Sequence, residues 1–173
     1  MEDKKLKVLE IFGSIDGEGR RAGELTTFIR FSGCNLRCSW CDTSYSQNGQ
    51  LGEFMTIADI VRKVQEINYV NITVTGGEPL IHQNITELLQ ALVSLGFDVN
   101  VETNGSIDPL PFMSIKGDGD LWFTIDYKST SSGMQSRMRE ENFINLRDKD
   151  VIKFVVGSKQ ELEDALKFLH TIE

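Results

Sequence analysis

The three cysteines of this chain lie close together, as Cys34, Cys38 and Cys41, and no other cysteine occurs among its 173 residues. Such clustering does not suit a disulfide framework. Thiolates at short spacing are ligands of 4Fe–4S clusters, and three of them leave one iron open for a substrate or cofactor. Structural zinc usually takes four ligands, and neither His82 nor His170 has a spacing that would supply the fourth. The spacing therefore favours an iron–sulfur site, with structural zinc and free thiols as the alternatives.

A second segment suited to chemistry follows the next predicted strand. The cysteines come after the apolar run at 27–31, and Thr75-Gly76-Gly77-Glu78-Pro79 comes after the run at 72–75. Parallel α/β sheets hold their functional groups at the carboxyl ends of the strands. The glycines allow the backbone to approach a ligand closely, and Glu78 offers an acceptor for an ammonium group. Taken alone, a glycine pair after a strand is only a turn.

The elements that position these loops alternate along the chain, which predicts an α/β fold with a largely parallel sheet. The expected strands are short and rich in β-branched residues, at 8–12, 27–31, 72–75, 99–102, 121–126 and 151–156. The expected helices have apolar residues at helical spacing, at 56–67, 84–95 and 158–172. The polar segment 129–150 is predicted to be a long loop.

Local signals predict where the helices begin and end. The expected capping residues are Thr56 with Asp59, Ser158 with Glu161, and Asn84 at the starts, and Gly96 at an end. The last helix is expected to bury the face that carries Leu162, Ala165, Leu166 and Leu169.

The composition is that of one soluble domain spanning residues 1–173, with 40% apolar and 25% charged residues. Lys and Arg number 18 against 26 Asp and Glu, which gives a net charge of −8. This acidic balance argues against nucleic acid or an anionic membrane as the main partner. The sequence contains no apolar stretch long enough to cross a bilayer and no signal-peptide pattern at its start, so a cytoplasmic location is expected.

At these residues the chain resembles the radical S-adenosylmethionine superfamily and, within it, the 7-carboxy-7-deazaguanine synthases of queuosine and other deazapurine biosynthesis. The segments that carry the resemblance are 10–19, 27–43, 101–105 and 125–128. The resemblance implies a partial, open β/α barrel with a shortened C-terminal part. It also implies a carbon–nitrogen lyase that converts 6-carboxy-5,6,7,8-tetrahydropterin to 7-carboxy-7-deazaguanine and ammonia.

The cofactors implied by the resemblance are a 4Fe–4S cluster on Cys34, Cys38 and Cys41, S-adenosylmethionine, and Mg²⁺ at Thr43. The residues implied to contact S-adenosylmethionine are Trp40, Cys41, Asp42, Gly76, Gly77, Glu78, Glu102, Asn104, Asp126 and Lys128. For residues 102–104, hydrogen bonding to the cysteine loop alone is the alternative role, and for Thr43 the alternative is that it only caps the loop.

The residues implied to bind the pterin are Ile15, Asp16, Gly17, Glu18, Arg30 and Thr75. A guanidinium such as Arg30 forks onto a carboxylate, and a carboxylate such as Glu18 accepts pterin N–H donors. Asp16 departs from the glutamine that is common in the family, and residues 126–128 depart from its usual Ser-Pro-Lys. An ordinary loop at 15–19 and a surface charge at Arg30 are the alternatives.

The family usually continues with a further strand and a tail that reaches the substrate, so a second copy of this chain is expected to complete the site as a homodimer. A flavodoxin or a ferredoxin is the implied electron donor. The alternative functions are a glycyl-radical enzyme activase, which the Asp126-Tyr127-Lys128 motif would suit, and a catalytically inactive iron–sulfur or zinc-binding protein.

Overall fold

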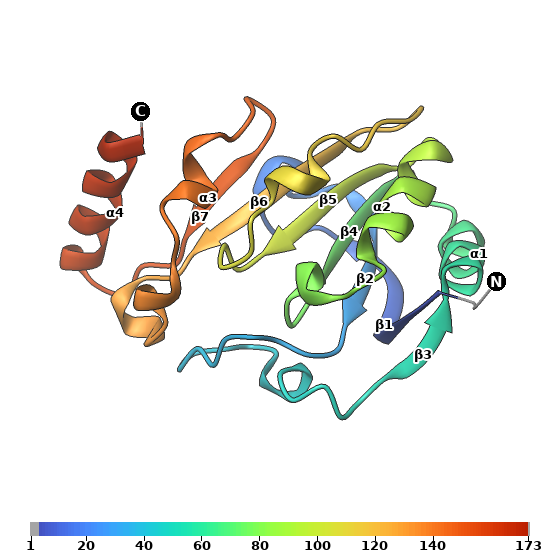
Figure 1. The fold of residues 1–173 in the computed structure, drawn as a ribbon, viewed down its shortest axis with the longest axis horizontal. Helices are drawn as coiled ribbons and strands as arrows, with labels where there is room; N and C mark the ends of the chain where they lie inside the picture. The colour runs from blue at the N-terminus through green and yellow to red at the C-terminus, as the bar shows by residue number, and fades with distance from the viewer. Residues whose placement is uncertain (1–3, 173) are drawn as a thin grey trace.

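The computed structural model describes residues 4–172, which form one seven-stranded sheet with helices packed on it (Figure 1). The strands are β1 (Lys5–Ile15), β2 (Leu25–Phe31), β3 (Glu53–Thr56), β4 (Asn71–Gly76), β5 (Asp98–Thr103), β6 (Leu121–Tyr127) and β7 (Val151–Phe154). Their order across the sheet is β3-β1-β2-β4-β5-β6-β7. β1 is antiparallel to β2 and β3, and each neighbouring pair from β2 to β7 is parallel. The predicted largely parallel α/β sheet is therefore confirmed.

The α-helices of the described residues lie at both ends of this sheet and over its middle. They are α1 (Ile57–Ile67), α2 (Ile85–Ser94), α3 (Glu141–Ile144) and α4 (Lys159–Ile172). Figure 1 shows α2 in front of the central strands, α1 beside β3, and α4 beyond β7 at the opposite end. Short 3-10 turns lie between the main elements, at η1 (Gly19–Arg21), η2 (Ser44–Ser46), η3 (Pro79–Ile81), η4 (Leu110–Phe112), η5 (Thr130–Ser132) and η6 (Gln135–Arg137).

The parallel strands are buried on both faces, but the two faces differ in chemistry. Alternate residues point to opposite faces of a strand. The apolar set joins Leu88, Leu89 and Leu92 of α2 in the core and comprises Ile72, Val74, Val99, Val101, Phe123 and Ile125. The other set is polar and just as buried, and comprises Thr73, Thr75, Asn100 and Thr124. This polar face lines the inside of a partial barrel and supplies the floor of the site described below.

Most of the predicted helix ends are confirmed. The Thr56 hydroxyl accepts from the Asp59 N–H at 3.1 Å, and Gly96 follows α2 in a left-handed conformation with φ of +83°. Ser158 accepts from the Glu161 N–H at 3.2 Å. Asn84 is the N-cap residue of α2, as predicted, but its side chain makes no capping bond and instead donates to the Lys5 carbonyl at 3.0 Å. A long-range partner thus outcompetes the local one.

The structure differs from the predicted elements in three further places. β3 was not predicted, and it pairs antiparallel to β1 as an edge strand. The segment 129–150 is not one long loop, because it contains η5, η6 and α3. The predicted buried face of the last helix is misplaced: Leu162 and Leu166 are half exposed, whereas Ala165 and Phe168 are buried. The ring centroids of Phe168 and Tyr127 lie 4.3 Å apart, and this aromatic contact sets the orientation of α4.

No helix within residues 4–172 is both long and apolar enough to span a bilayer.

Candidate active site

A cavity of about 370 Å³ opens at the carboxyl ends of the parallel strands. Most of the predicted site residues line it, namely Glu18, Arg30, Cys34, Cys38, Trp40, Cys41, Asp42, Thr43, Thr75, Gly76, Gly77, Glu102, Asn104, Asp126 and Lys128. The predicted residues that lie outside this lining are Ile15, Asp16, Gly17 and Glu78. Residues that sequence reasoning did not assign also contribute, among them Thr124, Lys153 and Val155.

The loop that carries the cysteines is ordered by its own backbone. Gly33 N–H donates to the Ser46 carbonyl at 2.7 Å, and Cys34 N–H donates to the Gln47 carbonyl at 3.1 Å. Two N–H groups point at the Cys34 sulfur, from the Leu36 backbone at 3.4 Å and the Asn104 side chain at 3.7 Å. Donors of this kind stabilise a thiolate, whereas burial raises the pKa of Cys34 and outweighs them.

The three thiols are partly buried in the wall of one cavity. Burial also raises the pKa of Cys38, and the nearby Lys128 ammonium opposes that rise. Within residues 4–172 no group of three or more His, Cys, Asp or Glu side chains converges to hold one metal ion. Three thiols in the wall of one cavity suit a multinuclear cluster, which takes each thiolate on a different iron.

The glycine turn is locked against the start of the cysteine loop. A Cβ at Gly77 would lie 2.0 Å from the Gly33 carbonyl oxygen, and one at Gly76 would lie 2.4 Å from the backbone N and O of Phe31. Gly76 also has φ of +140°, which favours glycine. Two backbone hydrogen bonds join the segments, from Gly77 N–H to the Phe31 carbonyl and from Glu78 N–H to the Gly33 carbonyl. The two loops therefore form one unit.

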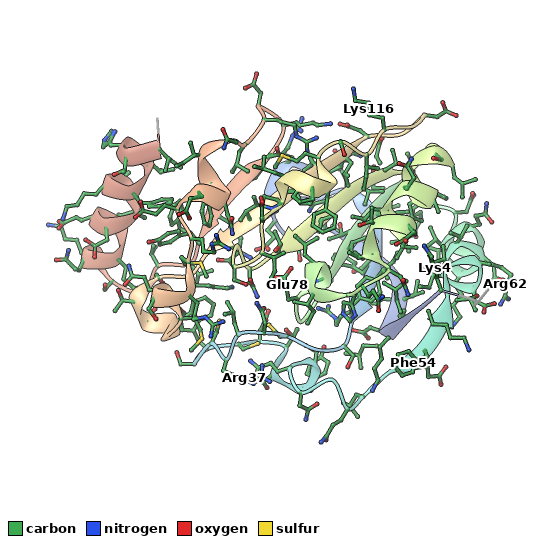
Figure 2. The ribbon with its side chains drawn as sticks, in the orientation of Figure 1. Lys4, Arg37, Phe54, Arg62, Glu78 and Lys116 are labelled. Carbon is green, nitrogen blue, oxygen red and sulfur yellow. The ribbon has the colours of Figure 1, made fainter. Side chains whose placement is uncertain are left out.

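Glu78 lies behind the cavity lining, and its predicted contact with S-adenosylmethionine stays a prediction. Its side chain is fully buried and does not line the cavity, and Figure 2 shows it within the body of the fold, with Arg37 at the outer edge of the cysteine loop. One carboxylate oxygen accepts from Thr103 Oγ1 at 2.8 Å, and the other accepts from Asn104 N–H at 2.7 Å. Burial raises the pKa of Glu78, and these donors oppose the rise. Glu78 therefore fixes the end of β5 beside the cysteines.

Asn104 and Glu102 are both held by side chains from neighbouring segments. The Asn104 amide donates to Asn35 Oδ1 at 3.0 Å as well as to the Cys34 sulfur, so it contacts the cysteine loop as the alternative expectation described. Glu102 accepts from Thr75 Oγ1 at 2.7 Å. Burial raises the pKa of Glu102, and the Thr75 hydrogen bond opposes that rise.

Two lysines share one carboxylate at the ends of β6 and β7. Lys128 Nζ lies 2.8 Å from Asp126 Oδ2 and 5.2 Å from the centre of the Trp40 ring. Lys153 Nζ lies 3.6 Å from the same oxygen and also pairs with Glu18. The other oxygen, Asp126 Oδ1, is buried without a partner among the described residues. A buried polar atom without a partner beside a cavity suits a ligand that donates a hydrogen bond.

The predicted pterin-binding residues separate into two groups. Arg30 and Thr75 are neighbours in the pairing of β2 with β4, and both line the cavity. Arg30 Nε donates to Glu10 Oε1 at 2.7 Å. Asp16 is buried below the cavity, where its carboxylate accepts from Thr73 Oγ1 at 2.9 Å, and Ile15 is exposed to solvent. Ile15, Asp16 and Gly17 as substrate contacts therefore stay predictions.

The segment 129–132, within the predicted long loop, contacts the cysteine loop on the side away from the glycine turn. Ser39 N–H donates to the Ser132 carbonyl at 2.9 Å, and Trp40 Nε1 donates to Ser131 Oγ at 3.1 Å. Ser131 N–H in turn donates to Glu161 of α4 at 2.6 Å. The capping pattern at Ser158 and Glu161 is the local sequence signal that falls in this contact.

A partial barrel with three cysteines and a glycine turn at one edge of its sheet defines a class of iron–sulfur proteins, and the Radical SAM superfamily model matches residues 28–169. Among curated relatives, the 7-carboxy-7-deazaguanine synthase of Clostridium acetobutylicum is 42% identical, covering 94% of this chain and 74% of its own length. That of Leptospira interrogans is 38% identical, covering 98% and 78%. The chain therefore belongs to the 7-carboxy-7-deazaguanine synthase family of the radical SAM superfamily.

A solved structure agrees on the fold. The crystal structure of QueE from Escherichia coli matches with a TM-score of 0.74 at 23% sequence identity, covering 96% of this chain and 78% of that chain. Membership of the superfamily implies a 4Fe–4S cluster and S-adenosylmethionine. The three thiols, with two N–H donors at the Cys34 sulfur, provide a ligand set that fits such a cluster.

Proposed function

We propose that this chain is a 7-carboxy-7-deazaguanine synthase, a radical SAM lyase that converts 6-carboxy-5,6,7,8-tetrahydropterin to 7-carboxy-7-deazaguanine and ammonia. The observation that carries the proposal is the shared cavity, in which Cys34, Cys38 and Cys41 face Glu18, Arg30 and Thr75. The names of the relatives support this reaction over the glycyl-radical activase that was the alternative.

When bound, the cluster and S-adenosylmethionine supply the one-electron chemistry of the reaction. The protein's own residues bind the cofactor and the substrate, orient them and exclude water from them. On the cofactor side, Trp40 and Lys128 pack together, and the buried Asp126 Oδ1 accepts a hydrogen bond from the ligand. The backbone of Gly76 and Gly77 offers a surface without side chains against which a ligand lies closely.

On the substrate side, Arg30 places a guanidinium beside the carboxylate of the pterin, and Glu18 accepts its N–H donors. Thr75 lies next to Arg30 across the sheet and orients the ring. Mg²⁺ at Thr43 is part of this proposal: the ion keeps several waters and binds substrate oxygens, so a single hydroxyl in the cavity wall suffices on the protein side.

Two partners complete the proposal. A flavodoxin or a ferredoxin donates the electron. A second copy of this chain covers β7, which pairs only with β6 and is one of the two edge strands of the sheet among the described residues.

The decisive experiment is anaerobic reconstitution with iron and sulfide, followed by reduction and addition of S-adenosylmethionine, Mg²⁺ and the pterin. Mass spectrometry is expected to show a product lighter than the pterin by one ammonia. Omission of Mg²⁺ tests the ion, and Cys38→Ser is the matched negative control. Formation of 5′-deoxyadenosine without conversion of the pterin would contradict the assigned substrate while leaving the superfamily chemistry in place.

A further inference from the structure

Lys153 is a charged residue inside a short apolar strand. It lies in β7 between Ile152 and Phe154, both of which pack against the core. Because neighbouring residues point to opposite faces, Lys153 points to the polar inner face of the partial barrel. The strand register places it directly beside Asp126 of β6. The strand therefore delivers an ammonium group into the cavity wall.

The ammonium of Lys153 joins two segments that are distant in the chain. It pairs with Glu18, in the connection between β1 and β2, and lies 3.6 Å from Asp126 Oδ2. Burial alone would lower the pKa of Lys153, but the hydrogen bond to Glu18 and the charges of Asp126 and Glu102 outweigh it, so the pKa lies above its usual value. Lys153 is thus charged at neutral pH.

The segment that Lys153 holds is the β1–β2 connection, residues 16–24. Its base is closed by two backbone hydrogen bonds of 2.8 Å between Asp16 and residues 23 and 24. Its tip crosses the inner face of the sheet to β7, where Arg20 donates to the Lys149 carbonyl at 2.9 Å. Of these two ties to the β7 region, only the Lys153–Glu18 pair lies in the cavity wall.

The charges around the cavity make Lys153 hard to replace. Four carboxylates line the cavity, at Glu18, Asp42, Glu102 and Asp126, against the cations Arg30, Lys128 and Lys153. Lys128 pairs with Asp126 and lies over the Trp40 ring, and Arg30 donates a hydrogen bond to Glu10. Without Lys153, Glu18 and Glu102 would face each other without a nearby cation, which would disfavour both the present position of the turn and an anionic ligand.

We propose that Lys153 is a positioning residue for the substrate: it clasps residues 16–24 to β7 through Glu18 and holds that turn in the shape that binds a carboxylated pterin. This inference rests on the proposed function for its substrate and on the described contacts for the clasp. Lys153 acts through Glu18, so its loss weakens substrate binding without removing a reacting group.

The test compares Lys153→Met and Lys153→Arg with Lys149→Met in the full-length chain. Lys149 pairs with Asp120 outside the cavity lining, and its carbonyl still accepts from Arg20 after substitution, so it is a matched control. The first readout is amide hydrogen exchange of residues 16–24 without substrate. The second is the split between KM for the pterin and kcat in the reconstituted enzyme.

Lys153→Met is expected to speed exchange in residues 16–24 and to raise KM roughly tenfold, the size of one charge-assisted hydrogen bond, with kcat within about threefold of the parent. Lys153→Arg is expected to have an exchange rate in residues 16–24 and a KM close to those of the parent. Lys149→Met is expected to match the parent in both. Unchanged exchange in Lys153→Met, or a fall in kcat at constant KM, would overturn the clasp. If the parent enzyme fails to convert the pterin, the proposed function fails, while the exchange measurement still decides the clasp.

Discussion

The backbone N–H of Ser131 donates to Glu161 Oε1 at 2.6 Å, and this hydrogen bond connects α4 to the cysteine loop. Ser131 is the residue that accepts from Trp40, and the other Glu161 oxygen accepts from Gly157 N–H at 2.7 Å. The start of the last helix therefore positions a loop more than a hundred residues earlier in the chain.

Glu161→Gln tests this connection through pH. The N–H groups of Gly157 and Ser131 hold the pKa of Glu161 at about 2, below its ordinary 4.5. A carboxyl whose pKa is lower in the folded state stabilises that state above its unfolded pKa, and this contribution is lost as the pH falls through 4.5 towards 2. Urea unfolding is expected to show the parent more stable than Glu161→Gln at pH 6, and the two converging near pH 2. A difference independent of pH would contradict the assignment.

Glu78→Gln is expected to destabilise the fold and reduce iron uptake. One Glu78 oxygen accepts from the Leu80 backbone N–H and the other from the Asn104 backbone N–H, so either orientation of the glutamine amide places an N–H group against a buried backbone donor, at a cost of about 1–3 kcal/mol. Chemical denaturation and the iron content after reconstitution measure the two effects. Glu66→Gln, at an exposed helix position, is the control and is expected to match the parent in both.

Gly77→Ala tests the contact between the glycine turn and the cysteine loop. A Cβ 2.0 Å from the Gly33 carbonyl oxygen forces the two loops apart, with an expected loss of about 3 kcal/mol or more and poor iron uptake. Gly17→Ala is the matched variant for stability and iron content, because nothing lies within 4 Å of its added Cβ. Equal iron content in the two variants would show that the loops are not coupled.

Glu102→Gln is expected to stabilise the fold while impairing turnover. Burial raises the pKa of Glu102 in the folded state, so its charge opposes folding increasingly as the pH rises above its ordinary value of 4.5. Glutamine removes the charge and can still accept from Thr75 Oγ1. The gain in unfolding free energy is expected to grow with pH, which denaturation at pH 4 and pH 8 measures. A gain in unfolding free energy that is larger at pH 4 than at pH 8 would contradict a raised pKa of Glu102.

The sequence was sufficient for features that depend on local spacing. The cysteine loop, the glycine turn and the parallel strands all have short-range patterns, and their approach at one sheet edge follows from strand direction. The features it missed depend on partners far along the chain. The position of Lys153 in the cavity wall depends on the pairing of its strand with Asp126 in the neighbouring strand. The orientation of Glu78 depends on hydrogen-bond donors at the end of β5.

The same distinction explains the misplaced face of the last helix. Leu162, Leu166 and Phe168 are all apolar, so helical spacing alone permits more than one buried face. The aromatic contacts of Phe168 with Tyr127 and Phe143 decide between them, and neither of those residues is near α4 in sequence. Lys153 nevertheless left a readable signal, since a lone charge in an apolar strand marks the side that faces a polar interior.

The locked contact between Gly77 and Gly33 also bears on how the holoenzyme is assembled. Ordering a flexible peptide around a metal normally consumes part of the binding free energy, because each fixed residue loses about 1–2 kcal/mol of conformational entropy. Here the backbone around Gly33 and Cys34 is held by hydrogen bonds to Ser46, Gln47 and Glu78 that involve no metal ligand side chain. The entropy cost of ordering that stretch is therefore part of folding, and the cluster binds to a loop whose backbone is already ordered.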